Sequence, residues 1–210
     1  MEVRRVGDQA VLVLGAGPRS AAAIRGTVLE LAASGSLPEP RDVVAAATSV
    51  LLDGLVGPGA VAAWQSRLEA APLPELVPVD RNRGRQLTLP TTYDGPDLDR
   101  VAEAWSCSRE AVVERHQQVV FLVAFCGFAP GFAYCVPDPA LPEVPRRDVP
   151  RERVPTGSVA LAGEYCGIYP ARLPGGWQLI GRTPAVLFDP ARERPSMLEP
   201  GDTVRFRVLG

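Results

Sequence analysis

A group of arginines among prolines is the first candidate for binding chemistry in this chain. Residues 145–153 read PRRDVPRER. Each guanidinium presents a planar fork of donors that fits a carboxylate or a phosphate, and the prolines stiffen the backbone between them. The segment therefore predicts an anion site. The alternative is that these arginines lie at the surface and pair with neighbouring acids, which are Glu143, Asp148 and Glu152.

Aromatic side chains surround a Pro-Gly pair in the segment GFAPGFAY at residues 127–134. Phe128, Phe132 and Tyr134 could form the walls of a pocket, because small-molecule sites are mostly apolar with a few placed polar groups. They could equally belong to the core. Pro130-Gly131 interrupts the strand pattern, so both interpretations stay open.

A second rigid loop occurs at residues 174–184, which read PGGWQLIGRTP. Glycine permits a close backbone approach, and proline fixes the chain direction before Trp177. Arg182 follows an apolar run, so it must be paired or lie at the mouth of a pocket; we favour the mouth. Loops of this kind often carry function on a rigid scaffold.

Several common catalytic motifs are absent, including G-x-S-x-G, the Walker A segment and H-E-x-x-H. The four cysteines form no C-x-x-C pair and His116 is the single histidine, so we expect no metal site. His116 falls at the end of a predicted helix, where a cation is favoured, and we interpret it as a helix-capping residue.

The composition is that of a globular protein, with 210 residues, 46% hydrophobic and 22% charged. A net charge of −2 gives no electrostatic footprint for nucleic acid. No apolar run has the length of a membrane span, and we expect a cytoplasmic protein with reduced thiols. The 22 prolines and 20 glycines favour many turns and a β-rich part.

The first part of the chain has the pattern of a small α+β unit. Residues 3–6 and 10–14 predict a hairpin, and a helix is expected from Pro18 to a C-cap at Gly35. Residues 42–53 could be one strand or two, and residues 61–71 predict a second helix. Three prolines and a charged run make residues 72–85 the best linker, with its arginines interpreted as solvated.

The second part begins near Gln86 and is richer in β-structure. After a strand at 86–93, two helices are expected at 97–105 and 109–117, the second capped by Ser108. Short apolar runs then alternate with turns, which is typical of a sandwich or barrel. The predicted strands are 119–125, 159–162, 178–180, 186–188 and 203–208.

Together these segments resemble a known family. GFAPGFAY, PRRDVPRERVPTGSVALAG, GIYP, PGGWQLIGRTP, LFDP and PGDTVRF are similar, in order and spacing, to the family of the 5-oxoprolinase B subunit. This family is also called allophanate hydrolase subunit 1, and it includes a sporulation histidine-kinase inhibitor and part of the urea carboxylase carboxyltransferase domain (subdomains C and D). The resemblance covers essentially the whole chain.

The resemblance implies a ferredoxin-like α+β domain at residues 1–84 and a cyclophilin-like β-barrel at 85–210. It implies one component of a hydrolase, which acts with a homologous C subunit and with an A subunit to convert 5-oxo-L-proline to L-glutamate. ATP, with Mg²⁺, would be bound by the complex, and the isolated chain would be inactive. The alternatives are an inhibitor of a sensor histidine kinase, or a carboxyltransferase-type half that works on urea or another amide with a biotin carboxylase.

The resemblance also places the site. Catalytic roles are implied for Arg182, Tyr134 and Arg151. Substrate binding is implied for Phe128, Pro130, Gly131, Phe132, Arg146, Arg147, Gly157, Ser158, Tyr169, Gly175, Gly176, Trp177 and Thr183, and Pro174 matches the same motif. The chain departs from the family at Tyr165 and Cys166, where Gln-Thr is usual, and at Cys126 and Cys135, where Leu is usual. The lost glutamine removes an amide from a predicted pocket position.

Overall fold

Alternating apolar residues at the start of the chain form the predicted hairpin. β1 (Glu2–Val6) and β2 (Ala10–Leu14) pair antiparallel around a turn in which Gly7 has a φ of 60°. Residues 42–53 form two further strands, β3 (Asp42–Ala45) and β4 (Ser49–Asp53). The resulting antiparallel sheet has the order β1-β2-β4-β3.

Two helices complete this first unit. α1 (Pro18–Ala33) begins at its proline and is followed by Gly35 with a φ of 69°, which agrees with the expected start and end. α2 (Ala60–Ala70) presents Trp64 and Leu68 to the core. Alternate sheet residues such as Val11 and Val13 are fully buried, so the helices cover one face of the sheet.

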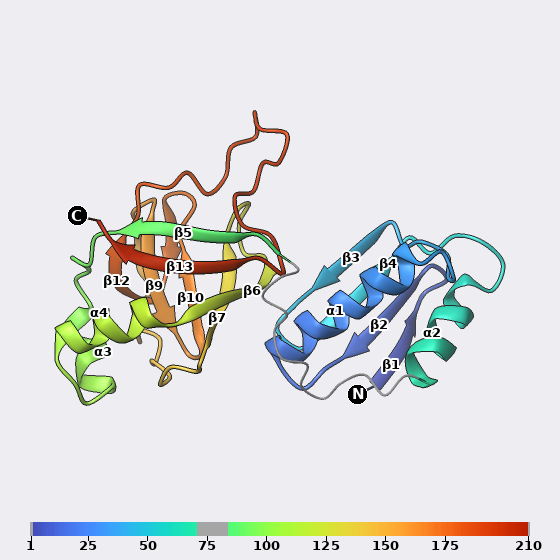
Figure 1. Ribbon diagram of the computed structural model, residues 1–210, viewed down its shortest axis with the longest axis horizontal. Coiled ribbons are helices and arrows are strands. Elements are labelled where there is room, and N and C mark those ends of the chain that lie inside the picture. The colour runs from blue at the N-terminus through green and yellow to red at the C-terminus, as the bar shows by residue number, and fades with distance from the viewer. Residues whose placement is uncertain (1, 71–83, 210) are drawn as a thin grey trace. The chain divides into compact units, whose positions relative to one another are not determined.

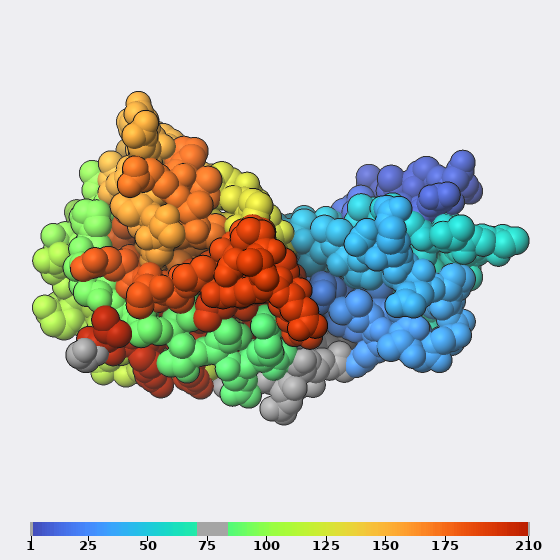
Figure 2. Space-filling model, turned by 90° about the horizontal axis from the view of Figure 1, so that it is seen from above, coloured from blue at the N-terminus to red at the C-terminus, as the bar shows by residue number. Residues whose placement is uncertain are grey.

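The computed structural model describes residues 2–70 and 84–209. The chain divides into two units, residues 1–80 and 81–210. Each unit is a compact body, blue to cyan for the first and green to red for the second (Figure 2). Most of the predicted linker at 72–85 lies outside the described residues. Arg85 is described and is not a free solvated side chain, because it donates to the buried carboxylate of Asp202 at 2.6 Å.

The second unit carries two helices and a long curled sheet. α3 (Leu98–Ala104) and α4 (Arg109–Gln118) match the predicted pair, and the Ser108 hydroxyl accepts the N–H of Ala111 as an N-cap. In the described residues the strands are β5 (Gln86–Thr91), β6 (Val120–Cys126), β7 (Ala133–Asp138), β8 (Arg151–Val154), β9 (Ser158–Ala162), β10 (Tyr165–Ile168), β11 (Leu173–Gly175), β12 (Gln178–Arg182) and β13 (Thr203–Val208).

Seven of these strands form one mixed sheet in the order β12-β9-β10-β7-β6-β13-β5. β13 runs parallel to β5, side by side with it in Figure 1, and antiparallel to β6. β8 and β11 form a separate two-stranded sheet. The large sheet curls until its ends meet, because Thr92 just after β5 bridges Arg182 of β12.

Further backbone hydrogen bonds beyond this bridge join the segment after β5 to β12. The N–H of Gly95 donates to Ile180 at 3.2 Å, and that of Asp97 donates to Leu179 at 3.0 Å. A Cβ on Gly95 would lie 2.2 Å from the Leu179 oxygen, so only glycine allows this approach. Residues 92–97 therefore seal the barrel-like sheet along β12.

The sequence prediction fails for some strands. Residues 186–188 form no strand; Phe188 makes one isolated bridge with Ser196, and Leu187 is the buried anchor of a loop. β7, β8, β10 and β11 were not predicted. β10 and β11 are short and carry Gly or Pro, β7 contains Pro137, and the charged residues of β8 give no apolar pattern. The described helices include none long and apolar enough to cross a membrane.

The expectation that His116 caps a helix is wrong. Its ring is fully buried, with Nδ1 2.8 Å from the Tyr93 hydroxyl and Nε2 3.4 Å from the Cys166 Sγ. Phe121 and Phe206 pack on it at centroid distances of 4.8 and 4.6 Å. The inner face of α4 points this side chain into the core, and burial lowers the pKa of His116 to about 3.

We predict a loss of stability in acid that depends on His116. The unfolded chain binds a proton at this ring near pH 6.5, whereas the folded chain does not until about pH 3, so acidification favours unfolding. Between pH 6.5 and about pH 3, His116 alone should lower the free energy of unfolding by up to about 1.4 kcal/mol for each pH unit of acidification. Urea unfolding of the wild type and His116→Gln between pH 7 and pH 4 measures it. The two curves should converge on acidification, and parallel curves would contradict the prediction.

Candidate functional site

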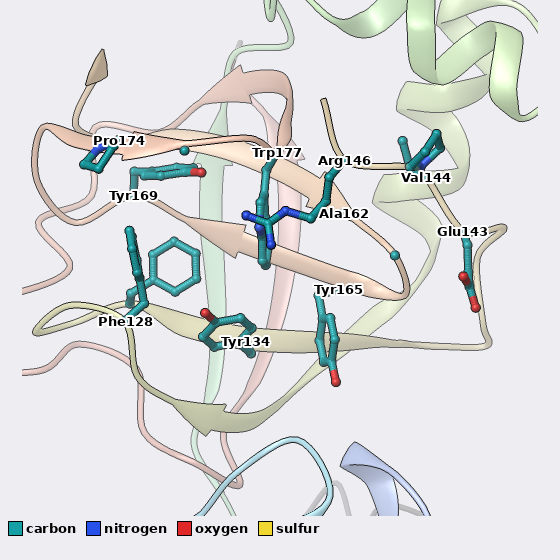
Figure 3. Close-up of a pocket in the computed structure, with 14 residues that line it drawn as sticks. Phe128, Tyr134, Glu143, Val144, Arg146, Ala162, Tyr165, Tyr169, Pro174 and Trp177 are labelled. Carbon is teal, nitrogen blue, oxygen red and sulfur yellow. The ribbon is translucent and has the colours of Figure 1, made fainter. Parts of the chain in front are cut away.

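A pocket of about 690 Å³ opens on the second unit, and aromatic side chains form most of its wall. They come from the loop after β6, from β7, from the start of β10 and from the loops on either side of β11 (Figure 3). The lining residues are Phe128, Phe132, Tyr134, Glu143, Val144, Pro145, Arg146, Ala162, Gly163, Tyr165, Tyr169, Pro174, Gly175 and Trp177.

Phe132 is the centre of the aromatic wall and is 1% exposed. Its ring meets Tyr134, Tyr169 and Trp177 edge-on at centroid distances of 5.0, 5.4 and 5.4 Å. Such T-shaped pairs are the favoured aromatic geometry and fix the orientation of each ring. Both open interpretations of this segment therefore hold, since Phe132 belongs to the core while Phe128 and Tyr134 face the pocket.

Arg146 supplies the positive charge of the pocket. In Figure 3 its guanidinium reaches in beside Trp177, above Tyr134. Within the described residues it forms no ion pair or hydrogen bond with a side chain or backbone oxygen. A guanidinium with free donors against an aromatic wall is suited to bind a carboxylate or phosphate.

The neighbouring arginines are committed elsewhere. Arg147 and Arg151 both donate to one carboxylate oxygen of Asp97, at 3.1 and 2.8 Å. The other oxygen accepts the backbone N–H of Leu179 at 2.7 Å, and the Asp97 side chain is 3% exposed. The anion for these two arginines is thus part of the chain itself. Neither the expected external anion nor the nearby acids of the alternative interpretation is their partner.

Two further hydrogen bonds hold the backbone on both sides of Arg146. The N–H of Arg147 donates to the Gly176 oxygen at 2.8 Å, and the Gln178 amide donates to the Pro145 oxygen at 2.9 Å. The loop that carries Arg146 is therefore fastened to the start of β12. These bonds hold the backbone that carries Arg146, while its side chain stays exposed to solvent.

Gly175 is required by the shape of the pocket. A Cβ at this position would lie 2.0 Å from the Tyr169 hydroxyl and 2.7 Å from its ring. The close approach places the Tyr169 ring in the wall, beneath β11. The aromatic pocket thus depends on a glycine that the sequence motif singled out.

Other predicted site residues form a support outside the pocket. Gly157 has a φ of 80°, and its backbone links to Tyr169 and Thr183 by hydrogen bonds of 2.8 Å. The Ser158 hydroxyl donates to the Pro155 oxygen at 2.8 Å. Gly131, with a φ of 81°, packs against Phe188 and Leu187. The predicted residues that do not line the pocket are Pro130, Gly131, Arg147, Arg151, Gly157, Ser158, Gly176, Arg182 and Thr183.

Of the three predicted catalytic residues, Tyr134 alone lines the pocket. Arg151 is bound to Asp97, and Arg182 lies at the seam of the barrel-like sheet with its side chain 68% exposed. The Arg182 guanidinium pairs with Asp94 at 2.9 Å. The expected position at a pocket mouth is wrong, because the bridge to Thr92 turns this side chain outward.

The ionisable side chains of the pocket are the Arg146 guanidinium, the Glu143 carboxylate and three phenols. Burial raises the pKa of Tyr134, Tyr165 and Tyr169 above the ordinary value, so all three phenols stay protonated at neutral pH. Glu143 stands exposed at the rim. The arrangement can bind an anion and stabilise developing negative charge, but it lacks an inward-facing base to take a proton. In the part of the chain that is described, no three His, Cys, Asp or Glu side chains gather to hold a metal ion.

Sequence reasoning missed two important residues. Asp97 gave no signal beyond the start of a helix, since its arginine partners are about fifty positions away. Tyr165 was noted as a departure from the family motif, and the structure places it in the pocket wall against Tyr134 at 5.6 Å. The other lining positions that the sequence did not mark are Glu143, Val144, Pro145, Ala162 and Gly163.

Fold and site together define a protein with an α+β unit and a β-rich unit, the second of which carries an aromatic pocket lined by one arginine. The model of the carboxyltransferase domain, subdomain C and D, matches residues 1–198. The chain therefore belongs to this family.

Curated relatives carry a more specific name. Proteins named as the B subunit of 5-oxoprolinase match at 49% identity in Escherichia coli O157:H7, 41% in Haemophilus influenzae and 42% in Bacillus subtilis. The matches cover 58%, 61% and 58% of this chain, and 57%, 62% and 52% of those relatives. The chain thus matches a little more than half of the length of each.

Solved structures share the architecture. A crystal structure of TTHA0988 matches with a TM-score of 0.72 and 34% identity, over 96% of this chain and 40% of that one. A conserved uncharacterized protein from Pyrococcus horikoshii matches with a TM-score of 0.57 and 32% identity, over 99% and 97%. The urea carboxylase of Kluyveromyces lactis, at 21% identity and a TM-score of 0.67 over 99% and 22%, shares the fold alone.

We predict that Asp97→Asn destabilises the chain by about 2 kcal/mol, because it removes the charge that two partly buried arginines share. Chemical denaturation measures the loss. Asp99→Asn is the matched control, since Asp99 is exposed, pairs with Arg109 and should change stability by less than about 0.5 kcal/mol. Equal effects of the two substitutions would contradict a central role for Asp97.

Proposed function

We propose that this chain is the B subunit of an ATP-dependent 5-oxoprolinase. In this proposal it acts with a homologous C subunit and with an A subunit to hydrolyse 5-oxo-L-proline to L-glutamate. The observation that carries the proposal is the 41–49% identity to three proteins that are named as this component of 5-oxoprolinase. The likeness to urea carboxylase concerns the fold and favours no substrate.

The pocket is the proposed substrate site. The carboxylate of 5-oxo-L-proline would bind the Arg146 guanidinium, and the compact ring would lie among the aromatic side chains. The protonated phenol of Tyr134 could donate to the lactam oxygen as negative charge develops on it. Because the one carboxylate that lines the pocket, Glu143, stands exposed at its rim, we propose that a partner protein of the complex carries out the proton transfers of hydrolysis. This agrees with a chain that is inactive when isolated.

ATP is proposed to bind elsewhere in the complex. The described residues of this chain offer one free guanidinium in the pocket and no acidic cluster for Mg²⁺, which is a poor match for a nucleoside triphosphate. We therefore assign no contact with ATP to these residues and derive no step through it.

We also propose finer fold assignments for the two units. The order β1-β2-β4-β3 with helices after β2 and β4 equals the ferredoxin-like order if β1 is counted as its last strand, which supports a circularly permuted ferredoxin-like domain. The curled seven-stranded sheet supports the cyclophilin-like assignment of the second unit.

The decisive experiment is ATP-dependent release of glutamate from 5-oxo-L-proline by this chain co-expressed with the A and C subunits. Omission of this chain is the control. Release that requires the chain is the expected result. A well-formed complex that releases no glutamate would overturn the proposed substrate.

Within that complex we predict that Arg146→Ala raises KM for 5-oxo-L-proline by about tenfold or more, because a charge-assisted bond to the carboxylate is lost. The KM of Arg146→Lys should lie between those of the wild type and Arg146→Ala, since lysine keeps the charge but not the planar fork. Steady-state kinetics measures both. Arg192→Ala, at an exposed pair with Asp189, is the control for loss of an arginine.

Arg182→Ala in the same assay tests the catalytic role predicted from the sequence. Its exposed position at the seam leads us to expect kinetics close to those of the wild type. A large fall in kcat would instead show that Arg182 takes part in catalysis.

A further inference from the structure

Phe128 has a backbone conformation that is unusual for its residue type. Its φ is 70°, in the left-handed region, where a Cβ and a bulky ring are disfavoured. Within the described residues, Ser106 is the other non-glycine residue with a positive φ, at 49°. An aromatic residue in this region is strained, and such strain tends to persist where it serves a site.

The turn around Phe128 enforces the conformation. The N–H of Gly127 donates to the Phe132 oxygen at 3.1 Å, and the N–H of Phe132 donates to the Ala129 oxygen at 3.0 Å. Gly131 then packs against the loop at Leu187 and Phe188. The neighbouring glycine, Gly127, does not occupy the left-handed position. A glycine at position 128 would adopt the observed φ without strain.

The fold does not offset this strain by burying the ring. Phe128 is 59% exposed, and its ring contacts that of Phe132 at a centroid distance of 5.3 Å. The ring nevertheless lines the pocket, and in Figure 3 it lies to the left of the Arg146 guanidinium, which is drawn beside Trp177. The apolar surface of this ring would leave water when a ligand fills the space between it and the guanidinium.

We infer that Phe128 determines the specificity of the pocket for a closed ring: its aromatic face packs on the ring of a small cyclic carboxylic acid whose carboxylate binds Arg146. This inference rests on the proposed function. It adds the reason that 5-oxo-L-proline is held in preference to its open-chain product. L-Glutamate presents a second charge and a flexible chain to the Phe128 ring, which offers no partner for either.

The test uses three single-substitution variants of the full chain. Phe128→Gly removes both the ring and the strain, Phe128→Ala removes the ring and keeps the strain, and Ser106→Gly relieves strain at a position outside the pocket. Calorimetry measures binding of 5-oxo-L-proline, L-proline and L-glutamate, and thermal unfolding measures stability. The same variants in the assembled complex give KM and kcat.

Both Phe128 variants should bind 5-oxo-L-proline about tenfold more weakly than the wild type, with binding of L-glutamate changed less than about twofold. In the complex, KM should rise and kcat should change little. Phe128→Gly should unfold at a higher temperature than Phe128→Ala, which reverses the usual order of these residues because φ is positive. Ser106→Gly should leave all binding unchanged.

Several results would overturn the inference. These are wild-type affinity for 5-oxo-L-proline in both Phe128 variants, an equal loss of L-glutamate binding, or no binding of any cyclic acid to the wild type. Binding of L-proline but not 5-oxo-L-proline, lost with Phe128, would support the inference while the proposed substrate fails. Glutamate release whose KM for 5-oxo-L-proline is unchanged by Phe128→Gly would support the proposed substrate and overturn the inference.

Discussion

The buried carboxylate of Asp97 is the interaction on which the site depends. It neutralises Arg147 and Arg151 and accepts the N–H of Leu179, so it joins the arginine loop to β12 at the seam where the curled sheet closes. A buried charge is tolerated only when it is paired and hydrogen-bonded, and here both oxygens are used. The pairing fixes the register of three segments that are far apart in the sequence. It also leaves Arg146, between the fastened residues, free to face the pocket.

The pocket combines the Arg146 guanidinium with an aromatic wall. Phe132 is held in the core and orients Tyr134, Tyr169 and Trp177 through edge-to-face contacts. Gly175 allows Tyr169 to lie against the backbone of β11. These features place one guanidinium against a rigid aromatic wall, which is the basis of the proposed binding of a compact anion. Because its inward polar groups are donors, the chain suits the role of one component in an assembly that supplies the remaining groups.

In the second unit, burial of one side chain stabilises the fold and backbone strain at another destabilises it. His116 is a buried imidazole that the core keeps neutral between Phe121 and Phe206, and it contributes to stability rather than to chemistry. Phe128, by contrast, is exposed and strained, which lowers stability in the free chain. The packed sheet supplies the stability that lets the loop at 127–132 hold one ring in an unfavourable conformation.

Strong local signals were enough to predict part of the structure. The hairpin at the start, the helix beginning at Pro18, the Ser108 cap and the apolar strand β6 follow from turn chemistry, capping and hydrophobic patterns within a few residues. The resemblance to the family implied substrate binding for Phe128, Arg146 and Trp177, and all three line the pocket.

Long-range contacts determine the rest of the site. Which arginine remains free depends on tertiary pairing, since the partner of Arg147 and Arg151 lies about fifty positions away. Arg182 turns outward because the sheet closes beside it, and His116 turns inward because α4 packs against the sheet. Sheet closure and helix packing set the direction of each side chain, and no short window of sequence encodes them.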